Sequence, residues 1–324
     1  MPPKVVTVPP TAARRRSAGG VGDAIFHALT LVFALIVLLI LGGIIISLLD
    51  GALPALREFG FGFFVTDRWN PVTEKFGALA PVYGTLVTSA IAMLIAIPVA
   101  FGIALFITEL CPIRLKRPLA TMIELLAAIP SIIYGIWGLF VLAPFVQDYI
   151  EPALIGSLGE VPGLGLLFAG PPLGIGVLTA GFILAVMVLP LISSIMRDVF
   201  LTVPPVLKES AYALGATTAE VAWQVVLPYA RIGVVGGILL GLGRALGETM
   251  AVTFVIGNSY HVHLSILQPG TTISAALANE FTEAVGDLYL SSLVALGLIL
   301  FVITFIVLAL ARLLMSRLQQ QAGS

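Results

Sequence analysis

Six long apolar stretches limit what this chain can fold into. A helix needs about 20 mostly apolar residues to cross a bilayer. Each stretch meets that length, and they cover residues 24–49, 83–108, 119–145, 173–196, 232–256 and 288–311. Only 10% of the 324 residues are charged, whereas soluble domains carry about 25%. The sequence therefore predicts an all-α membrane protein that crosses the bilayer six times.

The six stretches define one membrane domain, residues 23–315, between two tails. Residues 1–22 contain proline, glycine and three consecutive arginines, which predicts a disordered cytoplasmic tail beside anionic lipid. Residues 316–324 are expected to form a cytoplasmic C-terminal tail. The first apolar stretch follows arginines, as in a signal peptide, but its 26 residues exceed the usual core of about 7–15. We expect it to be a retained anchor.

The distribution of charge predicts the orientation. With the N-terminus in the cytoplasm, twelve cations lie inside and three outside. The inside set is Lys4, Arg14, Arg15, Arg16, Arg114, Lys116, Arg117, Arg197, Lys208, Arg231, Arg312 and Arg317, and the outside set is Arg57, Arg68 and Lys75. This bias fits the positive-inside rule and predicts that both termini are cytoplasmic. The net charge of −1 gives no general attraction to nucleic acid.

The loop at residues 197–231 is too polar to span a membrane and is patterned for helices. Thr202 is expected to cap a helix that begins near Pro205. Gly215 is expected to end that helix in a left-handed conformation. Residues 217–220 have the T-x-x-E spacing of a capping box, which predicts a second short helix. The loop is therefore expected to form a compact knob.

This loop resembles the EAA signature of binding-protein-dependent ABC importer permeases, E-A-A-x3-G-x9-I-x-L-P. Every spacing is kept, and the matching residues are Glu209, Ser210, Ala211, Gly215, Val225, Leu227 and Pro228. Ser210 replaces an alanine and Val225 an isoleucine, both conservative changes. In that family the segment docks into a groove of the ATPase, so the resemblance implies that these residues couple the chain to such a partner.

The energy source is expected to lie on another chain. None of the lysines is followed by Ser or Thr, so the sequence contains no Walker A motif, G-x4-G-K-[ST]. ATP and Mg are expected on the partner ATPase, and no cofactor or catalytic residue is expected here. The single cysteine, Cys111, excludes an internal disulfide and a cysteine-based zinc site. His261 and His263 form an H-x-H, but a structural zinc site needs four ligands, so an exposed polar loop is favoured.

Arg244 and Glu248 are the two charges in the fifth apolar stretch. A charge at the bilayer centre costs about 2.5–3.5 kcal/mol, so neither is expected to face lipid. At i and i+4 on one helix the two side chains can meet. We hypothesise that they line a translocation path. The alternative is a pair that neutralises itself while locking two helices together.

Small residues and prolines mark where helices pack or break. Gly233, Gly237 and Gly241 have the small-xxx-small spacing that lets another helix approach closely. Pro130 interrupts the third stretch, and backbone groups freed at a break can line a polar path. Ser131 is therefore a secondary path candidate, although an ordinary proline kink is favoured.

Four stretches resemble phosphate importer permeases of the PstC type. They are residues 240–258, residues 127–138, Trp69–Pro71 with Phe76 and Gly77, and Gly84–Thr85. The resemblance implies a type I importer fold in the bacterial cytoplasmic membrane and phosphate as the solute. It also implies a PstA-type permease partner, two PstB-type ATPase copies and a PstS-type phosphate-binding protein.

The first outer connection is rich in aromatic residues, which are expected to form a belt at the membrane interface. They are Phe59, Phe61, Phe63, Phe64 and Trp69.

Two alternatives stay open. The first is a permease for another oxyanion, such as sulfate or molybdate, because the EAA signature is shared by importers of many solutes. The second is an ion-coupled secondary transporter with Glu248 as its proton site. The match to the EAA signature and the lack of an inverted repeat count against that second class.

Overall fold

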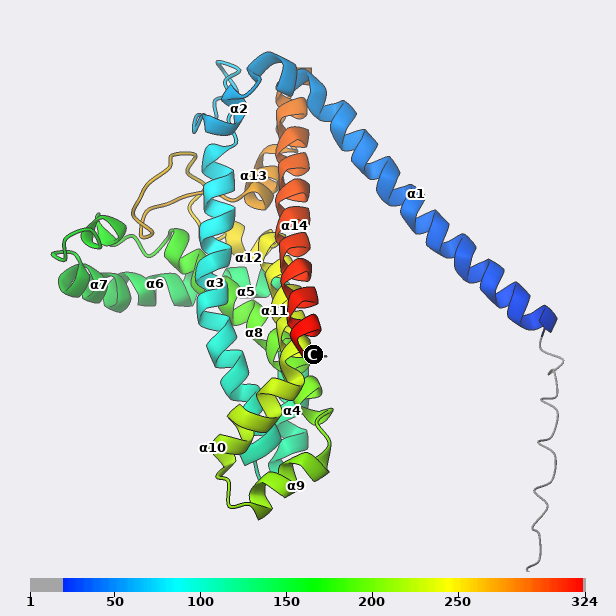
Figure 1. Cartoon of the computed structure of the whole chain (residues 1–324). Helices are drawn as coiled ribbons and strands as arrows, with labels where there is room; N and C mark the ends of the chain where they lie inside the picture. Colours follow the sequence, from blue (N-terminus) through cyan, green and yellow to red (C-terminus); the bar gives the residue numbers. More distant parts are fainter. Residues whose placement is uncertain (1–19, 323–324) are drawn as a thin grey trace, which may run out of the picture. The chain divides into compact units, whose positions relative to one another are not determined.

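The computed structural model describes residues 20–322 (Figure 1), so most of the predicted tail at residues 1–22 lies outside the described part. Four of the helical segments labelled η are π-helical turns, and η4 is a 3-10 turn. The elements are α1 (Gly20–Phe59), α2 (Gly62–Val65), α3 (Leu79–Leu105), η1 (Phe106–Leu110), α4 (Ile113–Ala127), α5 (Ser131–Trp137), η2 (Gly138–Leu142), α6 (Ala143–Phe145), η3 (Val146–Ile150), α7 (Glu151–Leu158), η4 (Gly165–Phe168), α8 (Val177–Leu201), α9 (Pro205–Ala213), α10 (Thr218–Val221), η5 (Ala222–Val226), α11 (Leu227–Leu246), α12 (Met250–Thr253), α13 (Ile273–Glu280) and α14 (Asp287–Ala322).

The chain divides into two units, one ending at Ser47 and the other beginning at Leu48. The described part of the first unit is the N-terminal portion of α1, which is apolar around its whole circumference. A helix of that kind suits a membrane span rather than a soluble bundle. The second unit contains the end of α1 and all other elements.

Six helical segments in the described part are long and apolar enough to cross a membrane, which confirms the predicted all-α, multi-pass class. They are Gly22–Phe59, Leu79–Leu110, Ser131–Leu158, Val177–Leu201, Thr218–Leu246 and Asp287–Leu313.

Two of the predicted spans are not continuous helices. The stretch at 119–145 is not one helix, because α4 ends at Ala127 and α5 begins at Ser131. Pro130 has no N–H to donate and disfavours helical backbone at the preceding residue, so the chain is interrupted there. The stretch at 232–256 is also broken, since α11 ends at Leu246. By contrast, α14 continues as a helix to Ala322, through most of the predicted C-terminal tail.

The core is built around α8, the most buried of the six segments. The glycine stripe of α11 packs against it, as the small-xxx-small spacing predicts. Cβ atoms added at the glycines would lie 2.5–3.0 Å from the nearest α8 side-chain atoms, in the pairs Gly233–Val199, Gly237–Ile195 and Gly241–Ile192. Side chains larger than hydrogen would therefore push the two helices apart.

A second close approach joins α3 to the segment that follows α12. A Cβ at Gly84 would lie 1.9 Å from the backbone oxygen of Thr271. The Thr85 hydroxyl accepts a hydrogen bond from the Ile273 N–H at 2.9 Å. The same segment, between α12 and α13, also contacts α8. There the backbone oxygen of Gln268 accepts a hydrogen bond from the Val177 N–H at 3.2 Å, which satisfies a free donor in the first turn of α8.

Aromatic side chains gather where α13 and the start of α14 lie. Trp69 stacks on Tyr260 with ring centroids 5.3 Å apart, and Tyr260 donates to Glu280 Oε1 at 3.1 Å. Tyr289 donates to the other oxygen of the same carboxylate. Burial, together with the Glu280 charge, raises the pKa of Tyr260 well above its ordinary value, so its hydroxyl stays a donor.

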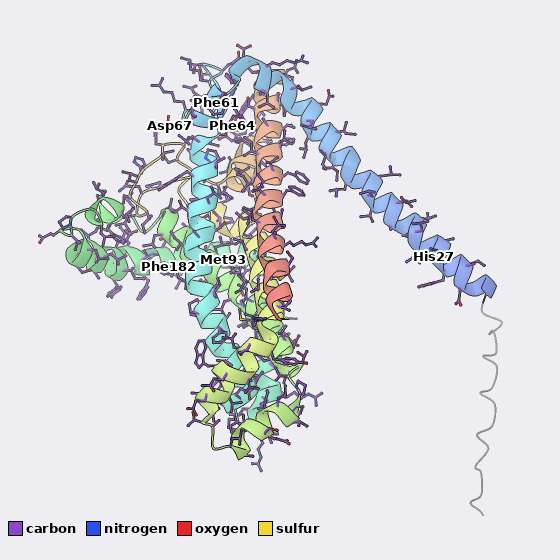
Figure 2. All side chains as sticks on the ribbon, in the orientation of Figure 1. His27, Phe61, Phe64, Asp67, Met93 and Phe182 are labelled. Carbon is purple, nitrogen blue, oxygen red and sulfur yellow. The ribbon has the colours of Figure 1, made fainter. Side chains whose placement is uncertain are left out.

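The expected aromatic belt is only partly right. Phe61 is 79% exposed and Phe64 is also exposed, as an interfacial belt requires (Figure 2). Phe63 is fully buried, and Trp69 is half-buried within the aromatic cluster, so these two are core residues. Alternation between lipid-facing and core-facing positions cannot be recovered from composition alone.

We expect Gly84→Ala to destabilise the chain by roughly 1–3 kcal/mol or more, because backbone atoms of Thr271 cannot move aside. Gly102→Ala is the matched control, since it lies in the same helix with open space around its Cβ position. Thermal unfolding of the detergent-purified variants measures the difference. Equal unfolding temperatures would contradict the close approach at Gly84.

Candidate functional site

The segment that resembles the EAA signature forms α9 and the turn after it. Every residue of α9 is exposed or half-buried, so the helix stands at the surface of its unit. Figure 1 shows it at the opposite end of that unit from α13. The predicted cap is wrong: the Thr202 hydroxyl donates back to Val199 O at 2.7 Å, at the end of α8. Pro204 occupies the N-cap position of α9 instead, so the helix begins without a side-chain cap.

Gly215 ends α9 in the predicted left-handed conformation, with φ at +90°. Ala216 N–H donates to Ala211 O at 3.1 Å and Gly215 N–H donates to Tyr212 O at 2.9 Å. These two hydrogen bonds form the Schellman motif, which provides donors for carbonyl groups that are otherwise free at the end of a helix. A side chain at position 215 would be strained in this backbone conformation.

The predicted capping box is confirmed. Glu220 N–H donates to the Thr217 hydroxyl, and Thr217 N–H donates to Glu220 Oε2 at 2.7 Å. The helix that begins there is not a separate short helix, however. It runs through α10 and η5 into α11, so Pro228 lies inside a continuous helix, directly after the π-helical turn and Leu227, and not at a helix start.

The residues matched to the signature divide into outward and inward groups. Glu209, Ser210 and Pro228 are exposed, whereas Ala211 and Leu227 are half-buried and pack on the core. Large apolar side chains beside them are also exposed: Leu214 is 90% and Trp223 60% exposed. The knob therefore presents an apolar surface of the kind that a protein partner covers.

A buried ion pair fixes α9 to the rest of the unit. Lys208 Nζ lies 2.6 Å from Glu109 Oε1, and the two side chains are only 17% and 8% exposed. Removing one partner of such a pair costs about 3–5 kcal/mol, because the other charge stays buried. This contact is not predicted from the sequence, where its only signal is an acidic residue, Glu109, at the end of an apolar stretch.

The second group of candidate residues lies where α11 ends. Arg244 is in the last turn of α11 and its side chain is exposed on this chain. Figure 1 shows α5 and α12 between α9 and α13, so this helix end is not at either end of the unit. A charged residue at this depth needs water or protein around it rather than lipid.

Arg244 and Glu248 do not form the predicted i, i+4 pair. The helix stops at Leu246, and Glu248 Oε1 accepts from Ala251 N–H at 3.3 Å, at the start of α12. Among the described side chains, no ion pair joins Glu248 to Arg244. The structure therefore gives no support to a self-neutralising lock between these two charges.

The predicted interruption at Pro130 is a full break rather than a kink. Ser131 is the first residue of α5 and is half-buried. The break is bridged by Tyr134, whose hydroxyl donates to Leu126 O in α4 at 2.8 Å. A second proline, Pro98 in the second apolar stretch, is also expected to interrupt its span, but it lies inside the continuous helix α3.

The two breaks face each other across α5 and α12. A Cβ at Gly135 would lie 2.7 Å from Phe254 Cδ2, 3.0 Å from Met250 O and 3.2 Å from Ala251 Cα, so a larger residue would force these neighbours to shift. Arg244 lies close enough to Tyr134 to interact with its hydroxyl electrostatically. The structure thus brings Arg244, Glu248 and the helix that begins at Ser131 to one region, and Tyr134 is a member that the sequence analysis missed.

The H-x-H pair is exposed at both histidines, with ring centroids 6.4 Å apart. Within the described residues no group of three or more His, Cys, Asp or Glu side chains converges as a metal site.

Comparisons with known proteins agree with this geometry. The family described as "Binding-protein-dependent transport system inner membrane component" matches residues 96–320, which is well over half of the chain. The match includes both the α9 knob and the region around Arg244.

Three relatives are similar over most of their length. The Phosphate transport system permease protein PstC of Mesorhizobium japonicum is 64% identical over 302 residues, which are 93% of this chain and 92% of the relative. The protein of the same name from Haemophilus influenzae is 54% identical over 93% of this chain and 95% of its own. A probable PstC of Methanocaldococcus jannaschii is 42% identical, covering 79% and 82%.

Two solved structures share the fold. A bacterial alginate ABC transporter aligns with a TM-score of 0.57 at 18% identity, over 89% of this chain and 93% of that one. The methionine ABC transporter MetNI, in an inward-facing conformation, aligns with a TM-score of 0.52 at 17% identity, over 75% and 94%. This chain therefore belongs to the binding-protein-dependent transport system inner membrane component family, alongside the PstC permeases.

Proposed function

We propose that this chain is the transmembrane permease subunit of an ATP-driven phosphate importer and forms one half of its translocation pathway. The observation that carries the proposal is the continuity of the chain from the exposed knob at α9 to Arg244, through consecutive helical segments from Thr218 to Leu246. Phosphate is the solute in the names of relatives that are 64% and 54% identical.

Arg244 is the residue we place in the translocation path. Its guanidinium is exposed on this chain, and lipid contact would cost about 2.5–3.5 kcal/mol, which favours a covering permease partner or a water-filled path. A guanidinium fork also matches phosphate oxygens better than a point charge does. Glu248 and Ser131 are the further path candidates, because both lie at the helix breaks next to α5 and α12.

The knob at α9 is the surface we propose for the ATPase. Its exposed apolar side chains and Glu209 offer the mixed contact that protein interfaces use. The sequence lacks a Walker A motif, so ATP and Mg belong to the partner. The full assembly would contain a PstA-type permease, two PstB-type ATPases and a PstS-type phosphate-binding protein.

The proposed orientation places α9 and both termini in the cytoplasm. Twelve predicted inside cations against three outside support it. The end of the unit that carries α13 would then face the phosphate-binding protein.

Cysteine labelling tests the orientation. Leu214 and Val285 are 90% and 88% exposed; Leu214 directly follows α9, and Val285 lies between α13 and α14. In intact cells, a membrane-impermeant maleimide should label Val285→Cys and spare Leu214→Cys, and lysed cells should label both. The native Cys111 is buried and should not contribute. Labelling of Leu214→Cys in intact cells would reverse the topology.

Arg244→Gln should abolish phosphate uptake in the reconstituted complex. We expect a loss of roughly 100-fold or more, because up to two charge-assisted hydrogen bonds of about 1.5–3 kcal/mol each disappear. The ATPase should still co-purify with this variant, because its proposed contact at α9 is remote in sequence from Arg244. Arg312→Gln, which removes another exposed arginine from a different helix, is the control. Normal phosphate uptake by Arg244→Gln would remove this residue from the path, and parallel sulfate measurements test the solute.

Leu214→Arg should weaken the ATPase contact by on the order of 10–30-fold, because hot-spot side chains at interfaces contribute about 2 kcal/mol. The side chain is almost fully exposed, so the fold of the chain should not change. Val285→Arg is the matched control at equal exposure. Retention of the ATPase on purified complexes and ATP-dependent uptake are the measurements. Unchanged retention with Leu214→Arg would exclude this surface as the docking site.

A further inference from the structure

A polar cleft lies between η1, α4 and α8, away from Arg244. Its volume is about 510 Å³. The charged side chains that line it are Lys116, Arg117, Glu124, Arg197 and Asp198. Thr108 lies in the wall of the cleft. The next residue, Glu109, forms the ion pair with Lys208 of α9, so the cleft is at the α9 end of the unit.

Arg197 uses two of its three nitrogens within the cleft. Nη2 donates to Glu124 at 2.8 Å and to Asp198 at 2.7 Å, and Nε also donates to Asp198. The third nitrogen, Nη1, is buried and has no hydrogen-bond partner among the described residues. A charged donor without an acceptor is costly to bury, so an acceptor in the cleft that reached this nitrogen would remove that cost.

The other two cations are not neutralised by the cleft itself. Both carboxylates of the lining are engaged by Arg197. Lys116 donates to the backbone oxygen of Thr108, and Arg117 is exposed and forms no ion pair with a described side chain. The cleft therefore has a net positive charge and donors from three side chains.

We propose that this cleft binds a phosphate group, carried either by an anionic lipid headgroup or by free inorganic phosphate. Two guanidinium groups and one ammonium group suit the several oxygens of a phosphate. Met122 and Leu125 of α4 are 60% and 64% exposed, as in a helix at the membrane surface, where lipid headgroups are found. The site is separate from the translocation path, and its cytoplasmic placement depends on the orientation proposed above.

Arg117→Gln tests the cleft, because Arg117 is exposed and its replacement leaves the Arg197 network intact. Arg114→Gln is the matched control, since Arg114 is an exposed arginine on the same helix that does not line the cleft. Arg197 is unsuitable, because its loss would leave Glu124 and Asp198 without their partner.

Two arms separate the sources of the phosphate group. In the first, the full chain is placed in phosphatidylcholine nanodiscs containing some phosphatidylglycerol, and retained phosphatidylglycerol is counted by native mass spectrometry. In the second, the nanodiscs contain phosphatidylcholine alone, and radiolabelled inorganic phosphate binding is measured by equilibrium dialysis. The second arm uses the Arg244→Gln background, so that the proposed path does not contribute.

We expect Arg117→Gln to weaken binding on the order of tenfold in at least one arm, with Arg114→Gln unchanged. A loss confined to phosphatidylglycerol identifies a lipid site, and a loss confined to inorganic phosphate identifies a solute site. Losses in both arms identify a site for the phosphate group from either source. The proposal is overturned if Arg117→Gln matches the parent chain in both arms, or if Arg114→Gln lowers binding as strongly.

Discussion

Backbone hydrogen bonds must be closed within the protein wherever a chain crosses a bilayer, because the hydrocarbon offers no water to pair them. This constraint governs both helix breaks. At the break between α4 and α5, the Tyr134 hydroxyl donates to the carbonyl of Leu126. At the break between α11 and α12, the Glu248 carboxylate accepts from the N–H of Ala251. Irregular backbone is thereby confined to the region where α5 packs on α12 through Gly135, and polar groups are concentrated there as a result.

Close helix packing holds this arrangement in place. The glycines of α11 let it lie so close to α8 that an added Cβ would force α8 side chains to shift, and Gly84 allows a close approach to the backbone of Thr271, in the segment after α12. At the other end, the Lys208–Glu109 ion pair attaches the knob to the helix that follows α3. The outer surface of the knob is thus exposed, while the ion pair holds the knob on the rest of the unit. A mechanical contact with a partner requires both.

Features set by a few neighbouring residues could be predicted from the sequence. Gly215 and the Thr217–Glu220 capping box depend on local backbone geometry, and both are confirmed. The number and class of the spans follow from composition. The end of α11 is not predicted. Gly247 is a residue type that often ends a helix, but the mostly apolar residues 250–256 after it resemble a continuation of the span, and their packing on α5 is a long-range contact. The Lys208–Glu109 contact joins residues 99 positions apart, beyond the reach of any local pattern.

The break after Leu246 also separates two charges mechanically. The 20 residues of α11 make a rod about 30 Å long, so a tilt of about 5° at the knob would displace its far end by roughly 2–3 Å. Arg244 is on that rod, whereas Glu248 is bonded to α12, which is seated on α5. A tilt of α11 alone would therefore change the distance between the Arg244 guanidinium and the Glu248 carboxylate. The electrostatic potential between these two groups would change with that distance.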